Sequence, residues 1–177
     1  MKKNFLKNSH PSHPIEWAYE YFIELLCHYA QSFQVTIHNY CLMSNHYHLL
    51  IQTHQENLSK LMRQINANYA IYFNKKYKRV GHLWQGRFQS WYVTDDAYLY
   101  TLILYIEQNP LKAKIVKDLQ TYPYISYHLF LEPSILPQCL EDAWIAQQYQ
   151  NDTEAIKAFL GSSVDTGQLQ ELKKLQV

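Results

Sequence analysis

Two histidines separated by one residue, His46 and His48, are the first side chains whose type and spacing suggest chemistry. They open a stretch ending at Thr53 that has the residue types of a β-strand, so both imidazoles should lie on one face, about 6–7 Å apart at Cα. Two imidazoles placed in this way can chelate one divalent cation. The pair is also compatible with two half-buried structural histidines, so a second group of residues is needed to decide between the two readings.

That second group is Tyr105 and Asn109, which are four residues apart in a segment that ends before Pro110. In a helix they share a face, about one turn apart. The tyrosine hydroxyl could then act as a nucleophile while the amide oxygen supplies a third metal ligand. The alternative is that Tyr105 belongs to the core and Asn109 only closes the helix.

The elements that would position these side chains follow from hydrophobic spacing and turn residues. We expect an α+β fold in which helices pack on one antiparallel sheet. Pro133 and Pro137 predict a boundary between a domain at 1–132 and a helical tail at 133–177. Within the first domain we expect a helix at 15–32, strands at 35–43 and 46–53 joined at Ser44-Asn45, a helix from Asn57 or Ser59, a loop at 81–86, a strand at 88–93 and a helix from Asp95 or Asp96 to about Asn109.

The formal net charge of +1 over 177 residues hides an uneven distribution of charge. No acidic residue occurs between Glu56 and Asp95, so the middle of the chain could bind phosphates or could simply be a solvated helix face. The basic residues in this stretch are Lys60, Arg63, Lys75, Lys76, Lys78, Arg79 and Arg87.

The cellular setting is predicted from the apolar runs and the cysteines. No apolar run approaches the roughly 20 residues that span a bilayer. The cysteines Cys27, Cys41 and Cys139 are widely spaced and include no CxxC pair, which predicts neither a disulfide framework nor a zinc knuckle. We therefore expect a reduced, cytoplasmic protein without a membrane partner.

Four motifs occur together in a specific order. They are Cys41–Ile51 (CLMSNHYHLLI), Tyr69–Asn74 (YAIYFN), Gly81–Phe88 (GHLWQGRF) and Tyr105–Pro110 (YIEQNP), the last followed by Lys112-Ala113. In this order and spacing, over roughly residues 20 to 130, the chain resembles the REP-associated tyrosine transposases. These are relatives of the single-strand insertion-sequence transposases in the HUH nuclease superfamily.

The resemblance implies a fold and a reaction. The fold would be a ferredoxin-like antiparallel sheet with helices on one face, the histidines on an inner strand and the tyrosine helix over the open face. Tyr105 would be the nucleophile, and His46, His48 and Asn109 would bind Mg²⁺ or Mn²⁺. The enzyme would cleave and rejoin single-stranded or hairpin DNA of the REP type through a 5′-phosphotyrosine, leaving a free 3′-hydroxyl.

The basic middle of the chain would supply the contacts to this DNA. Lysines and arginines there would hold phosphates through a salt-sensitive interaction, and Trp84 and Phe88 could stack on exposed bases. We expect no small-molecule cofactor, and either a monomer or a homodimer. The predicted DNA-binding residues are Lys75, Lys76, Lys78, Arg79, Trp84 and Arg87.

One feature departs from the family pattern. Relatives begin with a strand of the pattern Tyr-His-Val-x-x-Arg-Gly, whereas residues 1–14 here do not alternate like a strand. We therefore expect the first sheet strand to be missing and the domain to be truncated at its N-terminus. This leaves a non-catalytic or decayed DNA- or RNA-binding module as the alternative function, and a metalloenzyme acting on a small molecule as a more remote one.

Overall fold

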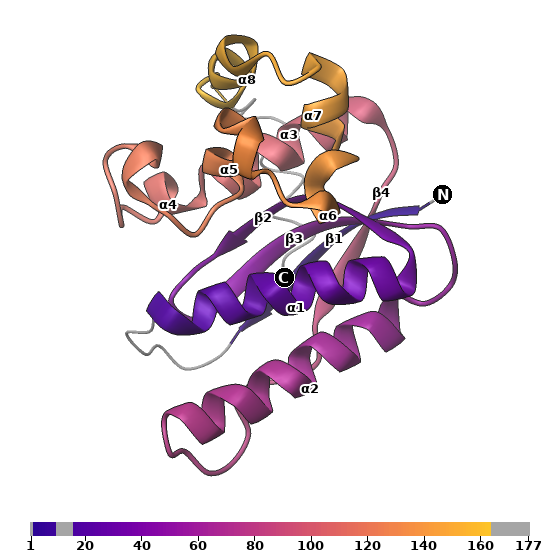
Figure 1. Ribbon diagram of the computed structural model, residues 1–177, viewed down its shortest axis with the longest axis vertical. Coiled ribbons are helices and arrows are strands. Elements are labelled where there is room, and N and C mark those ends of the chain that lie inside the picture. Colours follow the sequence, from indigo (N-terminus) through magenta and orange to yellow (C-terminus); the bar gives the residue numbers. More distant parts are fainter. Residues whose placement is uncertain (1, 10–15, 164–177) are drawn as a thin grey trace.

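Within residues 2–9 and 16–163, which the structure describes, the chain forms a four-stranded antiparallel sheet in the computed structural model (Figure 1). The strands lie in the order β2-β3-β1-β4. A strand-helix-strand-strand-helix-strand succession with this order is the ferredoxin-like arrangement, so the predicted fold is confirmed. Its elements are β1 (Lys2–Ser9), α1 (Glu16–Phe33), β2 (Val35–Leu42), β3 (His46–Thr53), α2 (Leu58–Lys76) and β4 (Gln89–Val93).

The first strand of the sheet is present, so the prediction that it is missing was wrong. β1 lies at the centre and pairs on one side with β3, from Lys2 opposite Thr53 to Ser9 opposite His46. On its other side it pairs with β4. Its sequence, KKNFLKNS, lacks the alternation of a strand with one apolar face. Its conformation is set by backbone pairing to two neighbours rather than by a side-chain pattern, which is why it could not be recognised from the sequence.

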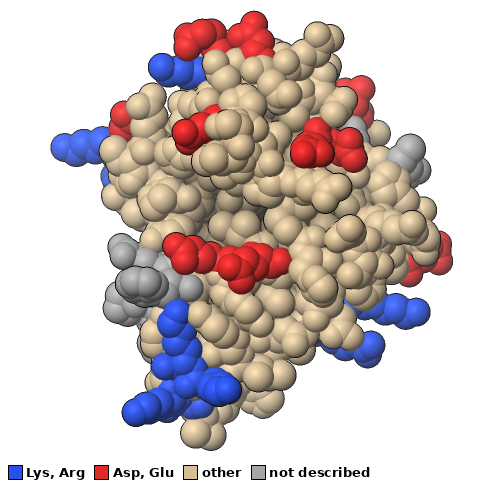
Figure 2. Space-filling model, in the orientation of Figure 1, with Lys and Arg blue, Asp and Glu red and all other residues tan. Residues whose placement is uncertain are grey.

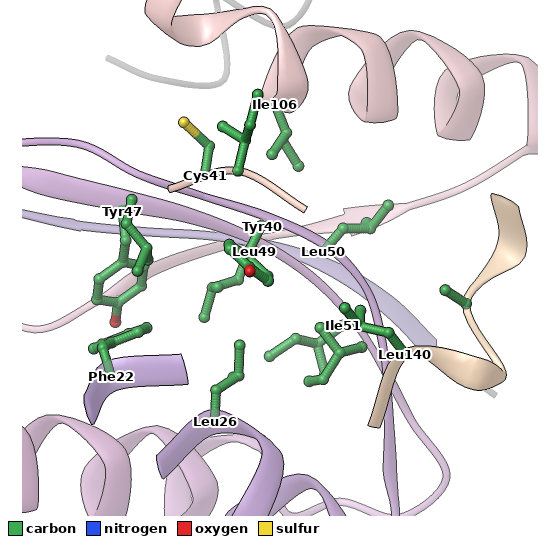
Figure 3. Packing of buried hydrophobic residues seen from close by; sticks show 14 of the residues in the cluster. Phe22, Leu26, Tyr40, Cys41, Tyr47, Leu49, Leu50, Ile51, Ile106 and Leu140 are labelled. Atoms are coloured by element: carbon green, nitrogen blue, oxygen red, sulfur yellow. The ribbon is translucent and has the colours of Figure 1, made fainter. Parts of the chain in front are cut away.

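The two faces of the sheet are covered by different helices, as Figures 1 and 3 show. The odd-numbered residues of β3, such as Tyr47, are buried on the side of α1 and α2, where they meet Phe22 and Leu26 (Figure 3). On the opposite side, Leu50 lies toward Ile106 of α3 (Asp96–Glu107). This division follows from the alternation of side chains along a strand. The even-numbered face of β3 carries the histidines, and α3 packs against this face.

Helix α3 begins and ends where local chemistry predicts. The Asp95 carboxylate accepts a hydrogen bond of 2.8 Å from the backbone N–H of Tyr98 and so caps the first turn. The helix ends at Glu107, and Asn109 opens a separate short turn, α4 (Asn109–Lys112). Pro110 lies in the first turn of α4, where its missing N–H costs nothing. The predicted single helix reaching Asn109 is therefore divided just before that residue.

The C-terminal part packs on the main fold. Tyr124 and Ser126 bond to the backbone of β2 and cover its outer edge. The backbone N–H of Trp144 donates a hydrogen bond of 3.0 Å to Nδ1 of His38 on β2. The division at residue 133 stays a prediction, and its tail is described only as far as residue 163. The remaining elements are η1 (Leu119–Thr121), α5 (Tyr127–Leu131), η2 (Pro133–Ile135), α6 (Gln138–Glu141), α7 (Trp144–Tyr149) and α8 (Thr153–Leu160).

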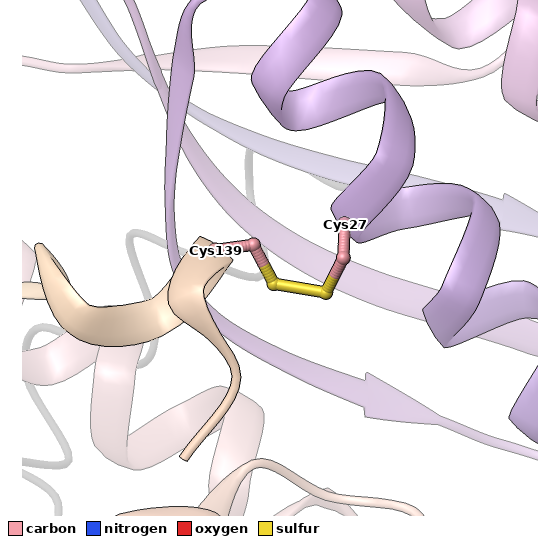
Figure 4. Close-up of a disulfide and its surroundings, with 2 residues drawn as sticks. All are labelled: Cys27 and Cys139. Carbon is pink, nitrogen blue, oxygen red and sulfur yellow. A yellow bond between two sulfur atoms is a disulfide. The ribbon is translucent and has the colours of Figure 1, made fainter.

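A disulfide joins Cys27 of α1 to Cys139 of α6, with 5.1 Å between the Cα atoms (Figure 4). The prediction of no disulfide was therefore wrong. The two cysteines are 112 residues apart in sequence, and only the packing of α6 against α1 brings them together, so no spacing motif could reveal the bond. Cys41 is a buried free thiol. None of the described helices is both long and apolar enough to cross a bilayer.

Candidate active site

His46 and His48 converge on one point above the even-numbered face of β3. Their Nε2 atoms are 3.1 Å apart, and their rings are nearly perpendicular, at 87°. The Nδ1 of His46 is 2.6 Å from Oδ1 of Asn45 in the turn before the strand. A carboxamide oxygen only accepts hydrogen bonds, so this contact places the proton of His46 on Nδ1 and leaves an Nε2 lone pair for a ligand.

The environment of His48 keeps its imidazole neutral. Burial lowers the pKa of His48 well below its usual value, and the nearby His46 and Lys7 lower it further. His48 is only 1% exposed. A neutral imidazole is the form that can coordinate a cation, and burial keeps His48 in this form at neutral pH.

Tyr105 lies against this histidine pair. Its ring centroid is 5.7 Å from that of His48, and the two rings meet at 77°. Tyr105 is half-buried on α3, the helix that packs over the histidine face of β2 and β3. The structure therefore brings together the phenol and the two imidazoles that the sequence placed on separate elements.

Asn109 lies one helical turn beyond Tyr105. Its Nδ2 donates a hydrogen bond of 2.8 Å to the backbone carbonyl of Tyr105. Because the amide nitrogen is used in this way, the oxygen Oδ1 is the atom that Asn109 can offer to a cation. Lys112, on the same short turn, places its Nζ 4.8 Å from the centroid of the Tyr105 ring.

The donor set fits a single divalent cation. Two nitrogens each about 2.1 Å from a metal and at right angles around it are about 3.0 Å apart, close to the 3.1 Å between the Nε2 atoms of His46 and His48. No cluster of three or more His, Cys, Asp or Glu side chains suited to a metal occurs in the described part of the chain. A further protein ligand would therefore be an amide oxygen such as that of Asn109, with the remaining positions left for water and phosphate.

Two ionisable residues, Lys7 on β1 and Glu107 on α3, were not identified from the sequence. Lys7 was missed because its strand, β1, was missed. Glu107 is completely buried two residues after Tyr105, and burial raises its pKa to about 8. Its carboxyl group accepts hydrogen bonds from the Ser126 hydroxyl and the Tyr127 N–H. The sequence signal for Glu107 was a carboxylate that directly follows the apolar run at 102–106 in α3.

The predicted DNA-binding residues fall into two groups on the α2 side of the sheet. Arg87 and Trp84 line a pocket of about 740 Å³ between α2 and residues 81–88, together with Arg63. The Trp84 Nε1–H donates to the Asn66 carbonyl at 2.9 Å, which fixes the indole as one wall of the pocket. The second group is at the end of α2, where Figure 2 shows lysines and arginines gathered at the lower left. It consists of Lys75, Lys76, Lys78 and Arg79, of which Arg79 lies over the Phe73 ring.

A ferredoxin-like sheet with a histidine pair beneath a helix-borne tyrosine is the arrangement that the sequence resemblance implied, and the family comparison agrees. The family model described as "Transposase IS200 like" matches residues 8–109, more than half of the chain. The chain therefore belongs to the IS200-like transposase family.

Two relatives make the comparison more specific. The chain is 30% identical over 115 residues to a Haemophilus influenzae protein described as a REP-associated tyrosine transposase, and the match covers 55% of this chain and 62% of that protein. The match thus spans about three-fifths of the length of the curated relative. A solved structure of a REP-associated tyrosine transposase bound to a REP hairpin superposes with a TM-score of 0.64 at 16% identity, covering 77% of this chain and 82% of that chain. At that identity the superposition shows the shared fold.

Proposed function

We propose that the chain is a metal-dependent tyrosine transposase that cleaves and rejoins single-stranded DNA beside a hairpin of the REP type. The proposal rests on one observation: the Tyr105 ring lies 5.7 Å from His48, whose Nε2 is 3.1 Å from that of His46. A nucleophile and a cation-binding pair are thus within reach of one phosphodiester. All three side chains come from one chain, so a single subunit carries the residues that the reaction needs.

The reaction would be a single displacement at phosphorus. The Tyr105 Oη attacks in line with the P–O3′ bond, and the P–O3′ bond breaks as the P–Oη bond forms. The phenolic proton passes to solvent, and the departing 3′ oxygen takes a proton from solvent. The products are a 5′-phosphotyrosine and a free 3′-hydroxyl, and attack by a 3′-hydroxyl on the phosphotyrosine reverses the step and rejoins DNA.

The residues around the phenol would orient it and hold the cation. His46, His48 and the amide oxygen of Asn109 would bind Mg²⁺ or Mn²⁺, which when bound would neutralise charge on the non-bridging phosphate oxygens. His48 would stay neutral because it is buried. The hydrogen bond from Asn109 to the Tyr105 carbonyl ties the ligand to the helix turn that carries the nucleophile.

The DNA would be held on the α2 side of the sheet. Lys75, Lys76 and Lys78 are exposed at the end of α2, where they can pair with the phosphates of the hairpin stem. Arg79 would extend this contact. Arg87, at the pocket beside Trp84, would hold the phosphate of an adjacent unpaired nucleotide, whose base could then stack on the indole. Action on chromosomal DNA would place the protein in the cytoplasm.

The test is covalent capture of labelled DNA. The full chain is incubated with Mn²⁺ and end-labelled single strands carrying the palindromes that flank its gene, and protein–DNA adducts are resolved on denaturing gels. Wild type should form an adduct, and Tyr105→Phe should not. Tyr100→Phe is the matched control, since Tyr100 lies on the same helix but packs on Trp144. Equal adduct from Tyr105→Phe would refute the proposed nucleophile.

The alternative of a non-catalytic binding module was motivated by the apparent loss of the first strand. Because β1 is present and paired on both sides, that motivation is gone. The alternative predicts hairpin binding without any adduct, in wild type as well as in Tyr105→Phe. The same gel, combined with a binding measurement, therefore separates the two functions.

A further inference from the structure

Two lysines from different elements flank the Tyr105–His48 pair. Lys7 is on β1, the strand directly beside β3. Lys112 is on α4, the turn that follows the tyrosine helix. They are 105 positions apart in the chain: Lys7 lies outside the four sequence motifs, whereas Lys112 follows the YIEQNP motif. Only the fold brings both lysines next to the Tyr105–His48 pair.

The position of Lys7 follows from strand register. Lys7 is the direct partner of His48 across the antiparallel pair of β1 and β3. Side chains of directly opposed residues point to the same face, about 4.5–5.5 Å apart at Cβ. Lys7 is half-buried, and its charge is one of the causes that lower the pKa of His48. An ammonium group therefore lies on the histidine face, on the opposite side of His48 from β2.

The position of Lys112 follows from the turn at Pro110. Because α3 ends at Glu107 and α4 starts at Asn109, the chain folds back so that Lys112 reaches over the Tyr105 ring, with its Nζ 4.8 Å from the ring centroid. Asn109 and Lys112 are three residues apart in one helical turn and lie near one another. Lys112 is exposed, so its ammonium can meet a ligand that arrives from solvent.

We propose that Lys7 and Lys112 form a phosphate clamp that holds the scissile phosphodiester beside the Tyr105 hydroxyl, with one lysine on the sheet and the other next to the tyrosine helix. The clamp rests on the proposed function, because the phosphate it holds is the one that Tyr105 attacks. Ammonium groups are compact charges with several donors and suit phosphate oxygens approached from different directions. Lys7 contacts one non-bridging oxygen from the strand side, and Lys112 contacts the other from the helix side.

The clamp is tested by the rate of adduct formation in a single turnover with the hairpin probe and saturating Mn²⁺. Lys7→Gln and Lys112→Gln should each slow the reaction about 100- to 1,000-fold, the range typical for loss of one preorganised hydrogen-bond donor at a transition state. Lys7→Arg and Lys112→Arg keep the charge and should recover much of the rate. Lys117→Gln, an exposed lysine beyond α4, is the matched control and should react like wild type.

A second measurement separates a direct contact from a structural effect. A methylphosphonate at the scissile position removes one non-bridging oxygen charge, so the difference in rate between wild type and each glutamine variant should shrink on that probe. This comparison does not depend on the thermal stability of the variants. A merely structural role would leave the same rate difference on both probes and would overturn the clamp.

The outcomes also distinguish the clamp from the function on which it rests. If wild type forms an adduct that needs Tyr105 but both glutamine variants react at the wild-type rate, the clamp is wrong and the transposase function stands. If wild type forms no adduct that needs Tyr105, the proposed function itself fails. A loss of hairpin affinity equal to the loss of rate would assign the lysines to general DNA binding and would also overturn the clamp.

Discussion

Asn45 and His46 are neighbours in the chain, and the Oδ1 of Asn45 lies 2.6 Å from the Nδ1 of His46. This contact fixes the ring orientation and the tautomer in which Nε2 faces its counterpart on His48. Partners of this kind typically contribute 10- to 100-fold to metal affinity. The motif Ser44-Asn45-His46 therefore carries a residue that orients His46 as well as the proposed metal ligand itself.

Replacing Asn45 should weaken metal binding without removing a ligand. Asn45→Ala should lower Mn²⁺ affinity by about 10- to 100-fold, because His46 loses the acceptor that orients it. Isothermal titration with Mn²⁺ alone measures this directly. Ser44→Ala, one residue earlier in the same exposed turn, should bind as wild type does. Unchanged affinity in Asn45→Ala would show that the contact does not organise the site.

Glu107 should make stability depend on pH. Its pKa is raised by burial from 4.5 to about 8, so between these values the folded state holds a proton that the unfolded state has lost. The free energy of unfolding should therefore fall as pH rises through this window, by up to about 1.4 kcal/mol per pH unit, and level off above pH 8.

Urea unfolding of wild type and Glu107→Gln across this window isolates the contribution of Glu107. Glutamine does not titrate, so the curve for Glu107→Gln should lack the fall, and its stability relative to wild type should improve steadily toward pH 8. Parallel curves for the two proteins would show that the carboxyl group is ionised in the folded state.

Reduction of the Cys27–Cys139 bond should destabilise the fold. The bond closes a loop of 112 residues, for which the chain-entropy model gives about 4–5 kcal/mol at 25 °C. Adding dithiothreitol should lower the urea midpoint of wild type. Cys27→Ser should already show the lower midpoint and should not respond to the reductant. If the urea midpoint of wild type is the same with and without dithiothreitol, the bond does not constrain the chain in solution.

Basic residues on the α2 side should contribute to hairpin affinity through phosphate contacts. Lys75→Gln and Arg87→Gln should each weaken binding and reduce the slope of log affinity against log salt by about 1. Fluorescence anisotropy with the hairpin probe at several salt concentrations gives both quantities. Lys157→Gln on α8, far along the chain from this surface, is the control. An unchanged slope in both test variants would place the DNA elsewhere.

Most of the fold could be predicted because its elements carry strong local patterns. The histidine strand follows a turn and contains an apolar run. Helix α3 starts after an aspartate cap. The central strand β1 could not be predicted, because its sequence, KKNFLKNS, has neither the alternation nor the β-branched residues typical of a strand. Lys7 was missed for the same reason, because it lies opposite His48 only through the pairing register of β1 and β3.

The site was predictable in part, for a related reason. Tyr105 and the histidine pair belong to motifs and could be proposed from residue order, and the fold then brought them together. Glu107 and the disulfide depend on packing between segments far apart in sequence. Glu107 meets Ser126 and Tyr127, and Cys27 meets Cys139. Contacts of this kind leave no periodic signal within either segment.

The central place of β1 also determines when the chain can finish folding. During synthesis β1 emerges first, yet its partners on the two sides end at Thr53 and Val93. β3 can pair with β1 once Thr53 has left the ribosome, but β4 cannot do so before Val93 has been made, so the four-stranded sheet closes only then. Pairing over such long sequence separation is slow to form, so the pairing of β1 with β4 should be among the last steps in the assembly of the sheet.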